Sequence, residues 1–451
     1  MRMMSQAVDA TRIPELQEVV RAALSAAVAA GASAAEADAS LQQGLSATVR
    51  LGEIETIEYQ RDRGLGITVY FGHRKGSAST ADLSAAAVLE TAQKACAIAR
   101  FTALDPCAGL ADPALLARDI PQLELDYPWE ISPDQAAALA LRCESAGRAV
   151  DTRISNSEGG SVSTQRAVRV YGNTNDFLAG HTSSSHSISC VLLAADQRGM
   201  QRDYWYSTAR DPLDLDVAEH IGQRAGERAV RRLGARRLTT RTAPVLFAPE
   251  VARGLFGHFV AAMRGGSQYR KASFLLGAAG QQVFPGFVQL QERPHLPKGL
   301  ASSPFDGEGV ATRDRALVTD GIAQGYVLSS YSARKLGLQS TGNAGGLHNL
   351  LVAPSRAGLD QAGLLREMGT GLLVTELMGQ GVNGVTGDYS RGASGFWIEG
   401  GELAFPVEEV TVAGNLKDMF TRIAAIGNDI DERSGIRTGS VLVDGLTIAG
   451  E

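Results

Sequence analysis

Two kinds of hydrophobic spacing divide the N-terminal part of the chain into helices and strands. Over residues 14–30, apolar side chains recur three or four positions apart in an alanine-rich stretch, which predicts an amphipathic helix. Residues 45–72 instead alternate apolar and polar side chains in three short runs, which predicts antiparallel strands separated by charged or glycine turns. A second alanine-rich helix is predicted over residues 82–101, beginning at Asp82.

The same order of patterns returns after a proline-containing linker at residues 106–133. A helix is predicted over residues 134–150, followed by β-like runs and by a closing helix over residues 217–234. The second unit, residues 134–242, therefore resembles the first unit, residues 1–105. Both are predicted to have the order helix, antiparallel strands, helix.

The C-terminal part, residues 243–451, has a different composition. It is rich in glycine and short β-like runs, apart from helices predicted at about 249–263 and 361–369. Residues 320–322 (DGI) and 401–403 (GEL) are typical of hairpin turns between strands. The fold class predicted for the whole chain is α+β, with two helix–strand–helix units followed by a large glycine-rich β-domain.

Composition limits the function classes. The 44% hydrophobic and 20% charged fractions of the 451 residues are those of a folded protein with several domains. The 43 Lys and Arg residues are outnumbered by 49 Asp and Glu residues, which argues against nucleic-acid binding by bulk charge. The four cysteines form no CxxC pair and favour reduced thiols in a cytoplasmic protein. We found neither a signal-peptide core nor an apolar run of the roughly 20 residues that cross a membrane.

Two short patterns have ordinary structural interpretations. Residues 379–384 match GxGxxG, but the glycine-rich sequence that follows predicts no helix to receive a dinucleotide phosphate. The basic cluster over residues 224–241 falls at the end of a predicted helix, where cations complement the helix dipole. Neither pattern therefore predicts a nucleotide or nucleic-acid site.

The helix predicted over residues 249–263 has the form of a metal-binding helix without its ligands. Its apolar residues form one stripe, and His258 lies off that stripe. A catalytic zinc ion needs about three protein ligands and an open position for water. Arg253 and Gly254 occupy the positions five and four residues before His258, and the charge of an arginine repels a metal ion. We therefore interpret His258 as a structural residue.

Three long stretches strongly resemble the TldD/PmbA family, and more closely its PmbA (TldE) branch. They are FVQLQERPHLPKGLASSPFDGEGVAT, YVLSSYSARKLGLQSTGNAGG and GVNGVTGDYSRGASGFWIEGGE, and the resemblance covers nearly the whole chain. It implies a two-component cytoplasmic metallopeptidase whose TldD subunit carries an HExxxH zinc helix and a further cysteine ligand near its C-terminus. In this chain Arg253 and Gly254 replace the first His and the Glu, only His258 matches, and the C-terminal region has no cysteine.

The resemblance therefore implies a non-catalytic subunit. Zinc is expected in a TldD-like partner, with no metal ligand, cofactor or catalytic residue in this chain, and unfolded or modified peptides are the expected substrates. Two other interpretations stay open: a stand-alone metallopeptidase with an unrecognised site, or a peptide-binding or gyrase-modulating protein. Residues of the third stretch are candidates to line the peptide cavity, or else only form stabilising turns: Asn383, Thr386, Asp388, Tyr389, Ser390 and Arg391.

Overall fold

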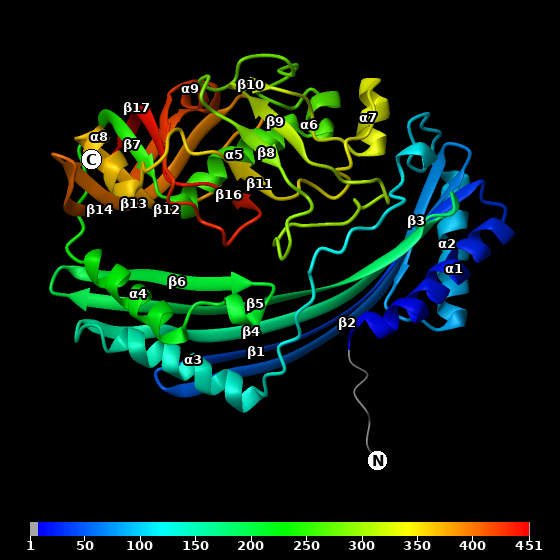
Figure 1. The fold of residues 1–451 in the computed structure, drawn as a ribbon, viewed down its shortest axis with the longest axis horizontal. Helices are drawn as coiled ribbons and strands as arrows, with labels where there is room; N and C mark the ends of the chain where they lie inside the picture. The colour runs from blue at the N-terminus through cyan, green and yellow to red at the C-terminus, as the bar shows by residue number, and fades with distance from the viewer. Residues whose placement is uncertain (1–7, 451) are drawn as a thin grey trace.

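A single antiparallel sheet joins the two N-terminal units. The computed structural model describes residues 8–450; residues 1–7 and 451, at the outer ends of the first and last predicted units, lie outside the described part. The six strands lie in the order β3-β2-β1-β4-β5-β6, so each unit contributes half of the sheet (Figure 1). Their bounds are β1 (Ala34–Arg50), β2 (Glu53–Phe71), β3 (Arg74–Thr80), β4 (Ile154–Asn173), β5 (Leu178–Asp196) and β6 (Gly199–Ala209).

Four helices cover one face of this sheet. Helices α1 (Ile13–Ala29) and α2 (Ala85–Phe101) pack at one end, and α3 (Pro133–Arg148) and α4 (Ala218–Arg231) pack at the other. Alternation along β1 explains the common face: its odd-numbered residues contribute to both helix-covered cores. Its even-numbered residues are polar or small and face the opposite, concave side, over which the C-terminal domain lies (Figure 1).

The strands of the first unit differ from the prediction in their lengths. The two runs predicted on either side of residues 61–63 form one continuous strand, β2, so the turn predicted there is wrong. The charged side chains need no turn because β3 pairs only with residues 65–71, which leaves the preceding part of β2 as an exposed edge. Strand β3 was not predicted. Ser84, rather than Asp82, caps α2 by accepting a hydrogen bond from the Ala87 amide.

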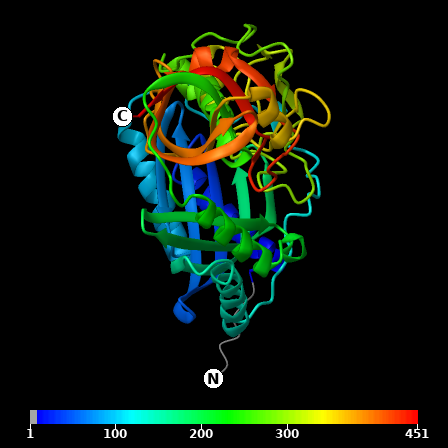
Figure 2. The same cartoon turned by 90° about the vertical axis from the view of Figure 1, so that its left-hand side faces the viewer.

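The C-terminal domain contains a closed β-barrel. Its strands run β14-β13-β12-β7-β17-β15, and pairing of β14 with β17 closes the ring seen in Figure 2. Helix α5 (Pro249–Met263) packs its apolar side into the main core of this domain, where Phe256 and Phe259 contact Phe284. The strands are β7 (Arg241–Phe247), β12 (Gly371–Met378), β13 (Asp388–Glu399), β14 (Glu402–Asn415), β15 (Ile423–Ile426) and β17 (Val441–Ala449).

A second, five-stranded sheet and several short helices complete this domain. The α+β class, the helices predicted near 249–263 and 361–369, and both hairpin turns are confirmed; Asp320 and Gly321 adopt the positive φ angles of a tight turn. Three further helices were missed, because they are too short to show a hydrophobic period. The remaining elements are β8 (Leu290–Glu292), β9 (Arg315–Thr319), β10 (Ile322–Ala323), β11 (Leu350–Val352), β16 (Ile436–Arg437), α6 (Gly265–Tyr269), α7 (Ser330–Leu336), α8 (Gln361–Met368) and α9 (Leu416–Thr421).

The predicted linker, residues 106–133, ties the sheet to the C-terminal domain. Arg334 of α7 donates hydrogen bonds to the carbonyls of Cys107 and Gly109, at 3.1 and 3.0 Å. Farther along, the Ala117 amide donates to the carbonyl of Gly309 at 2.9 Å. These contacts join the linker to α7 and to the loop that contains Gly309.

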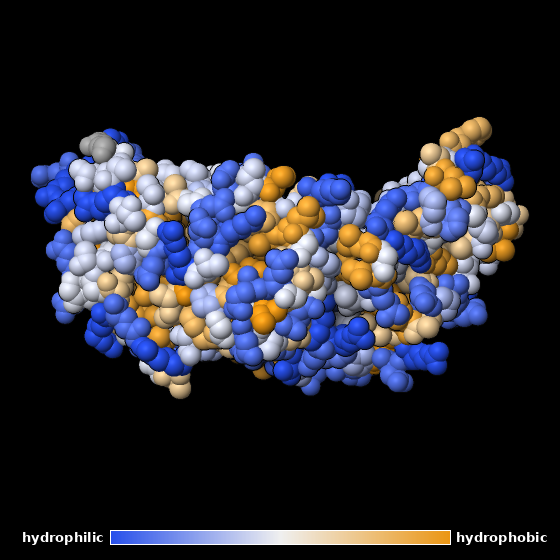
Figure 3. Space-filling model, turned by 90° about the horizontal axis from the view of Figure 1, so that it is seen from above, coloured by the Kyte–Doolittle hydropathy of each residue, from blue (hydrophilic) through white to orange (hydrophobic). Residues whose placement is uncertain are grey.

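Hydrophobic and hydrophilic residues are interspersed on the side of the molecule that carries the C-terminal domain (Figure 3). Along residues 8–450 we found no helix that is both long and apolar enough to cross a membrane.

We expect Gly222→Ala to destabilise the protein strongly. Helices α3 and α4 touch here so closely that a Cβ on Gly222 would lie 1.8 Å from the carbonyl oxygen of Cys143. Separating two packed helices should cost about 2–3 kcal/mol. Gly254→Ala is the matched control, because a Cβ in that helix meets nothing within 4 Å and alanine favours helix by about 1 kcal/mol. Urea midpoints of the two variants test this, and equal midpoints would contradict the packing described.

Candidate functional site

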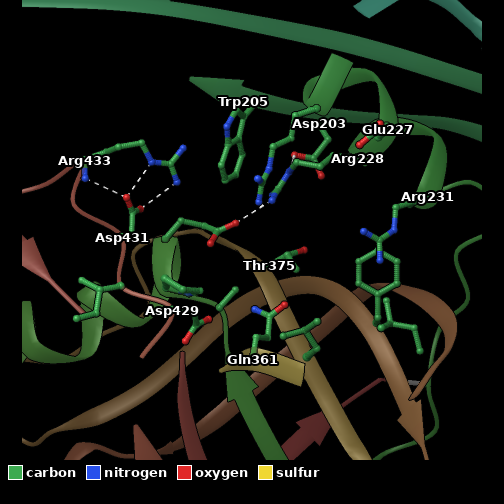
Figure 4. Close-up of a pocket in the computed structure, with 18 of the residues that line it drawn as sticks. Asp203, Trp205, Glu227, Arg228, Arg231, Gln361, Thr375, Asp429, Asp431 and Arg433 are labelled. Atoms are coloured by element: carbon green, nitrogen blue, oxygen red, sulfur yellow. Dashed lines mark hydrogen bonds and ion pairs between the residues drawn. The ribbon is translucent and has the colours of Figure 1, made fainter. Parts of the chain in front are cut away.

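Two adjoining cavities lie where the barrel meets the edge of the N-terminal sheet. The larger, of about 620 Å³, is lined by β6, α4, the start of α5 and residues 429–433 (Figure 4); we call it the tryptophan pocket. The smaller, of about 290 Å³, lies along α5 and the strands β12 and β13; we call it the α5 pocket. Glu250 and Thr375 line both, so the two pockets form one cleft.

Stacked arginines surround Trp205 in the tryptophan pocket. The guanidinium carbons of Arg224 and Arg433 lie 4.0 and 3.9 Å from its ring centre, and that of Arg228 lies at 5.0 Å. Arg224 and Arg228 share one face of α4 because they are four residues apart. Such stacking gives the arginines a fixed orientation at the cleft wall.

Three carboxylates of this pocket are held in ion pairs. Arg228 contacts Asp203 at 3.0 Å and Glu250 at 2.8 Å, and Arg433 contacts Asp431 at 2.8 Å (Figure 4). Burial alone would raise the pKa of Asp431, but the hydrogen bonds and charge of Arg433 outweigh it and lower that pKa. Asp431 is therefore ionised and paired at neutral pH, and it is poorly suited to act as a general acid.

Helix α5 places Arg253, Gly254 and His258 beside the smaller pocket. Arg253 and Gly254 line it, and Arg253 Nη1 donates a hydrogen bond to the Tyr206 hydroxyl at 3.2 Å. The His258 ring packs edge-on against Tyr389, with 6.1 Å between ring centres. Burial, and then the charge of Arg391, lower the pKa of His258, so its imidazole is neutral at physiological pH.

The six residues predicted to line the peptide cavity do not lie together: they occupy an exposed turn, the barrel core and the α5 pocket. Asn383, Thr386 and Asp388 form an exposed turn, in which Thr386 Oγ1 donates to Asp388 Oδ2 at 2.6 Å and Asn383 Oδ1 accepts from the amide of residue 385 at 2.9 Å. Ser390 is exposed and Tyr389 is buried in the barrel core. Arg391 lines the α5 pocket.

Sequence reasoning missed the tryptophan pocket. Its α4 arginines belong to the basic cluster over residues 224–241, which the sequence explains only through the helix dipole, and Arg433 comes from a distant part of the chain. The four-residue spacing of Arg224 and Arg228 indicates a shared face, but it does not show that this face meets Trp205 on a strand. That contact depends on the packing of α4 against β6.

The residues around α5 do not fit a zinc ion. The nearby groups are two guanidinium cations, Arg253 and Arg391, and a single imidazole. The two glutamates of this pocket already form ion pairs: Glu250 contacts Arg228 at 2.8 Å, and Glu376 contacts Arg232 at 2.5 Å. Within residues 8–450 no group of three or more His, Cys, Asp or Glu residues is arranged to hold a metal.

Comparison with known proteins gives matches along nearly the whole chain. Models of the PmbA/TldA metallopeptidase domain 1, central domain and C-terminal domain match residues 35–99, 126–233 and 240–450, respectively. Metalloprotease PmbA of Escherichia coli O157:H7 is 52% identical over 437 residues, covering 97% of this chain and 96% of that protein. A Metalloprotease PmbA homolog of Haemophilus influenzae is 48% identical, with 97% and 96% covered.

Solved structures share the fold. A candidate modulator of DNA gyrase from Bacteroides thetaiotaomicron superposes with a TM-score of 0.91 at 27% identity, covering 98% of this chain and all 100% of that one. TldE from Thermococcus kodakarensis superposes with a TM-score of 0.83 at 20% identity, covering 96% of this chain and 100% of that one.

Proposed function

This chain belongs to the PmbA/TldD family of metallopeptidase-like proteins, in its PmbA branch, and we propose that it is the non-catalytic subunit of a heterodimeric zinc peptidase. In the proposed complex a TldD-like partner holds the zinc ion, and this chain encloses the partner's active-site chamber. The substrates are unfolded or modified peptides. The proposed location is the cytoplasm, which suits the free thiols of Cys96, Cys143 and Cys190.

The observation that carries this proposal is the replacement of metal ligands on α5. Where the resemblance puts the first zinc histidine and the glutamate base, the chain has Arg253 and Gly254. The Arg391 guanidinium adds a second positive charge beside His258. Two cations next to one neutral imidazole disfavour a divalent metal ion, so hydrolysis has to rely on another subunit's zinc.

The shape of the chain supports an enclosing role. The concave face of the sheet carries polar side chains such as Asp38, Ser40 and Gln42 of β1, and the barrel lies over it (Figure 1). A subunit of this shape would exclude bulk water and folded proteins from a chamber while admitting an extended peptide. Homologous subunits often pair through equivalent surfaces, which suits a pseudo-symmetric dimer with a TldD-like partner.

The isolated chain should bind no stoichiometric zinc. Arg253 and Gly254 provide neither a ligand nor a base, and the C-terminal region contains no cysteine. Elemental analysis of the purified protein after extensive dialysis measures this directly. About one tightly held zinc ion per chain, together with chelator-sensitive cleavage of peptides by the chain alone, would favour a stand-alone metallopeptidase instead.

A further inference from the structure

The two arginines of the α5 pocket form no ion pair with a carboxylate of the described chain. Arg253 donates a hydrogen bond only to the Tyr206 hydroxyl, and Arg391 makes only a long contact of 3.4 Å from Nη2 to the carbonyl of Leu377. The two glutamates of the pocket already form ion pairs with arginines at or next to α4: Glu250 pairs with Arg228, and Glu376 pairs with Arg232. Within residues 8–450 neither guanidinium donates a hydrogen bond to a carboxylate, and Asp431 acts on Arg253 only through its longer-range charge.

Buried polar atoms beside this pocket have no hydrogen-bond partner in the described chain. They are Thr375 Oγ1, Arg391 Nε and the Tyr389 hydroxyl oxygen. Thr375 and Arg391 line the pocket, and Tyr389, which is only 2% exposed, lies two residues from Arg391 on the same face of β13. Because buried polar groups in folded proteins are nearly always hydrogen-bonded, the unpartnered atoms of Thr375 and Arg391 at the pocket wall call for a polar partner, which is either bound water or a group of a ligand.

There is also room for a ligand beside the two guanidinium groups. Gly254 carries no side chain, and even an added Cβ would meet nothing within 4 Å. The pocket of about 290 Å³ is large enough for a carboxylate with a short side chain next to it. Arg253 on helix α5 and Arg391 on strand β13 both line this space.

We propose that the α5 pocket binds a carboxylate group of the peptide, an inference that rests on the proposed function. A guanidinium fork matches the two oxygens of a carboxylate and can bind both at once. The free C-terminus of the peptide and an acidic side chain offer the same chemistry. Held at this end of the cleft, the peptide would extend from the α5 pocket along the rest of the chamber.

Fluorescence anisotropy with the full-length chain tests this without using peptidase activity. The probe is an unstructured octapeptide labelled at its N-terminus, in three forms: a free C-terminal carboxylate, a C-terminal amide, and the amide with aspartate as its last residue. We expect the free acid to bind about tenfold more tightly than the amide, because an ion-paired carboxylate contributes that much. Tight binding of the aspartate form as well would assign the pocket to acidic side chains too.

Arginine variants identify the pocket. Arg253→Gln and Arg391→Lys should each reduce binding of the acid to that of the amide, the first by removing a charge and the second by removing the fork. Arg356→Gln is the matched control, because Arg356 is 61% exposed and lies outside this pocket. Thermal unfolding of each variant verifies that it folds. If Arg391→Lys does not fold, because the Arg391 Nε atom is buried, Arg253→Gln still tests the pocket.

Equal affinity for the acid and the amide, or unchanged discrimination in both variants, would overturn the carboxylate site. This outcome is distinct from failure of the proposed function. A native chain that complements a TldD-like partner normally but does not prefer the acid to the amide refutes only the pocket. A native chain that prefers the acid but does not complement the partner refutes only the role in a complex.

Discussion

Mixing this chain with a TldD-like subunit should produce cleavage of an unstructured peptide that neither protein cleaves efficiently alone. We expect a gain on the order of 100-fold, because misplacing a catalytic group by about 1 Å already costs that much. The gain should saturate near an equimolar ratio, as one chain encloses one partner. Cleavage of a fluorogenic unstructured peptide, titrated with this chain at fixed partner concentration, measures both the size of the gain and the ratio.

Three controls locate the chemistry in the partner. A chelator should abolish the activity, and so should substitution of the partner's HExxxH residues. Introducing the missing groups here, as Arg253→His with Gly254→Glu, should not make this chain active alone, because the C-terminal thiolate is also missing and zinc needs its ligands together. A TldD-like subunit that is fully active without this chain would contradict the enclosing role and favour a peptide-binding function.

Glu292→Gln should destabilise the C-terminal domain by about 3 kcal/mol. Glu292 is 1% exposed and accepts hydrogen bonds from Arg315 at 2.6 Å, from Asn343 at 2.7 Å, and from both the amide and the ring of His348 at 2.9 and 3.0 Å. Removing its charge leaves Arg315, whose side chain is only 16% exposed, without a counter-ion; losing one partner of a buried pair typically costs about 3–5 kcal/mol, and the partial exposure of Arg315 places this case at the lower end. Glu158→Gln, at an exposed pair with Arg202, should cost under about 1 kcal/mol.

The same variant should change the response to acid. Burial alone would raise the pKa of Glu292, but the hydrogen bonds from His348 and the charge of Arg315 outweigh it and lower that pKa from 4.5 to about 2. Its contribution is therefore complete above pH 4.5 and is lost as the pH falls toward 2. Denaturant midpoints measured through this window should fall more steeply for the native chain than for Glu292→Gln; parallel slopes would contradict this account.

The hydrogen-bonded cluster around Glu292 joins two of the stretches that carry the family resemblance. Glu292 lies in the first stretch and Asn343 in the second, and the two side chains meet at 2.7 Å. The sequence contains both residues but not their contact, because 51 residues separate them. Only the folded chain shows that the two stretches build one hydrogen-bonded cluster at the end of β8, in the five-stranded sheet.

Elements with a long, regular hydrophobic pattern could be predicted from the sequence. The helix expected at about 249–263 is α5, Pro249–Met263, because its apolar stripe repeats over four turns. By contrast, α7 spans seven residues and depends on the Ser329 capping box, and the charged residues 61–63 concealed the continuity of β2 at an open edge. Helix α7 is too short to show a hydrophobic period, and charged residues interrupt the alternating pattern of β2.

The candidate site also has a part that could be interpreted from the sequence and a part that could not. The missing metal ligands lie on a single helix, so Arg253 and Gly254 could be interpreted from the sequence. Arg391 came from the family resemblance, and its approach to His258 requires β13 and α5 to meet in the barrel. Trp205 and the arginines stacked on it could not be predicted, because a strand and a helix from different parts of the unit form that contact.

The location of zinc in the assembled complex tests the central claim most directly. Anomalous X-ray scattering at the zinc absorption edge, from crystals of this chain bound to a TldD-like partner, should show one zinc ion per heterodimer. We predict that it lies on the partner's HExxxH helix and that no anomalous peak lies beside Arg253 and His258. A fully occupied zinc peak in the α5 pocket of this chain would contradict the account.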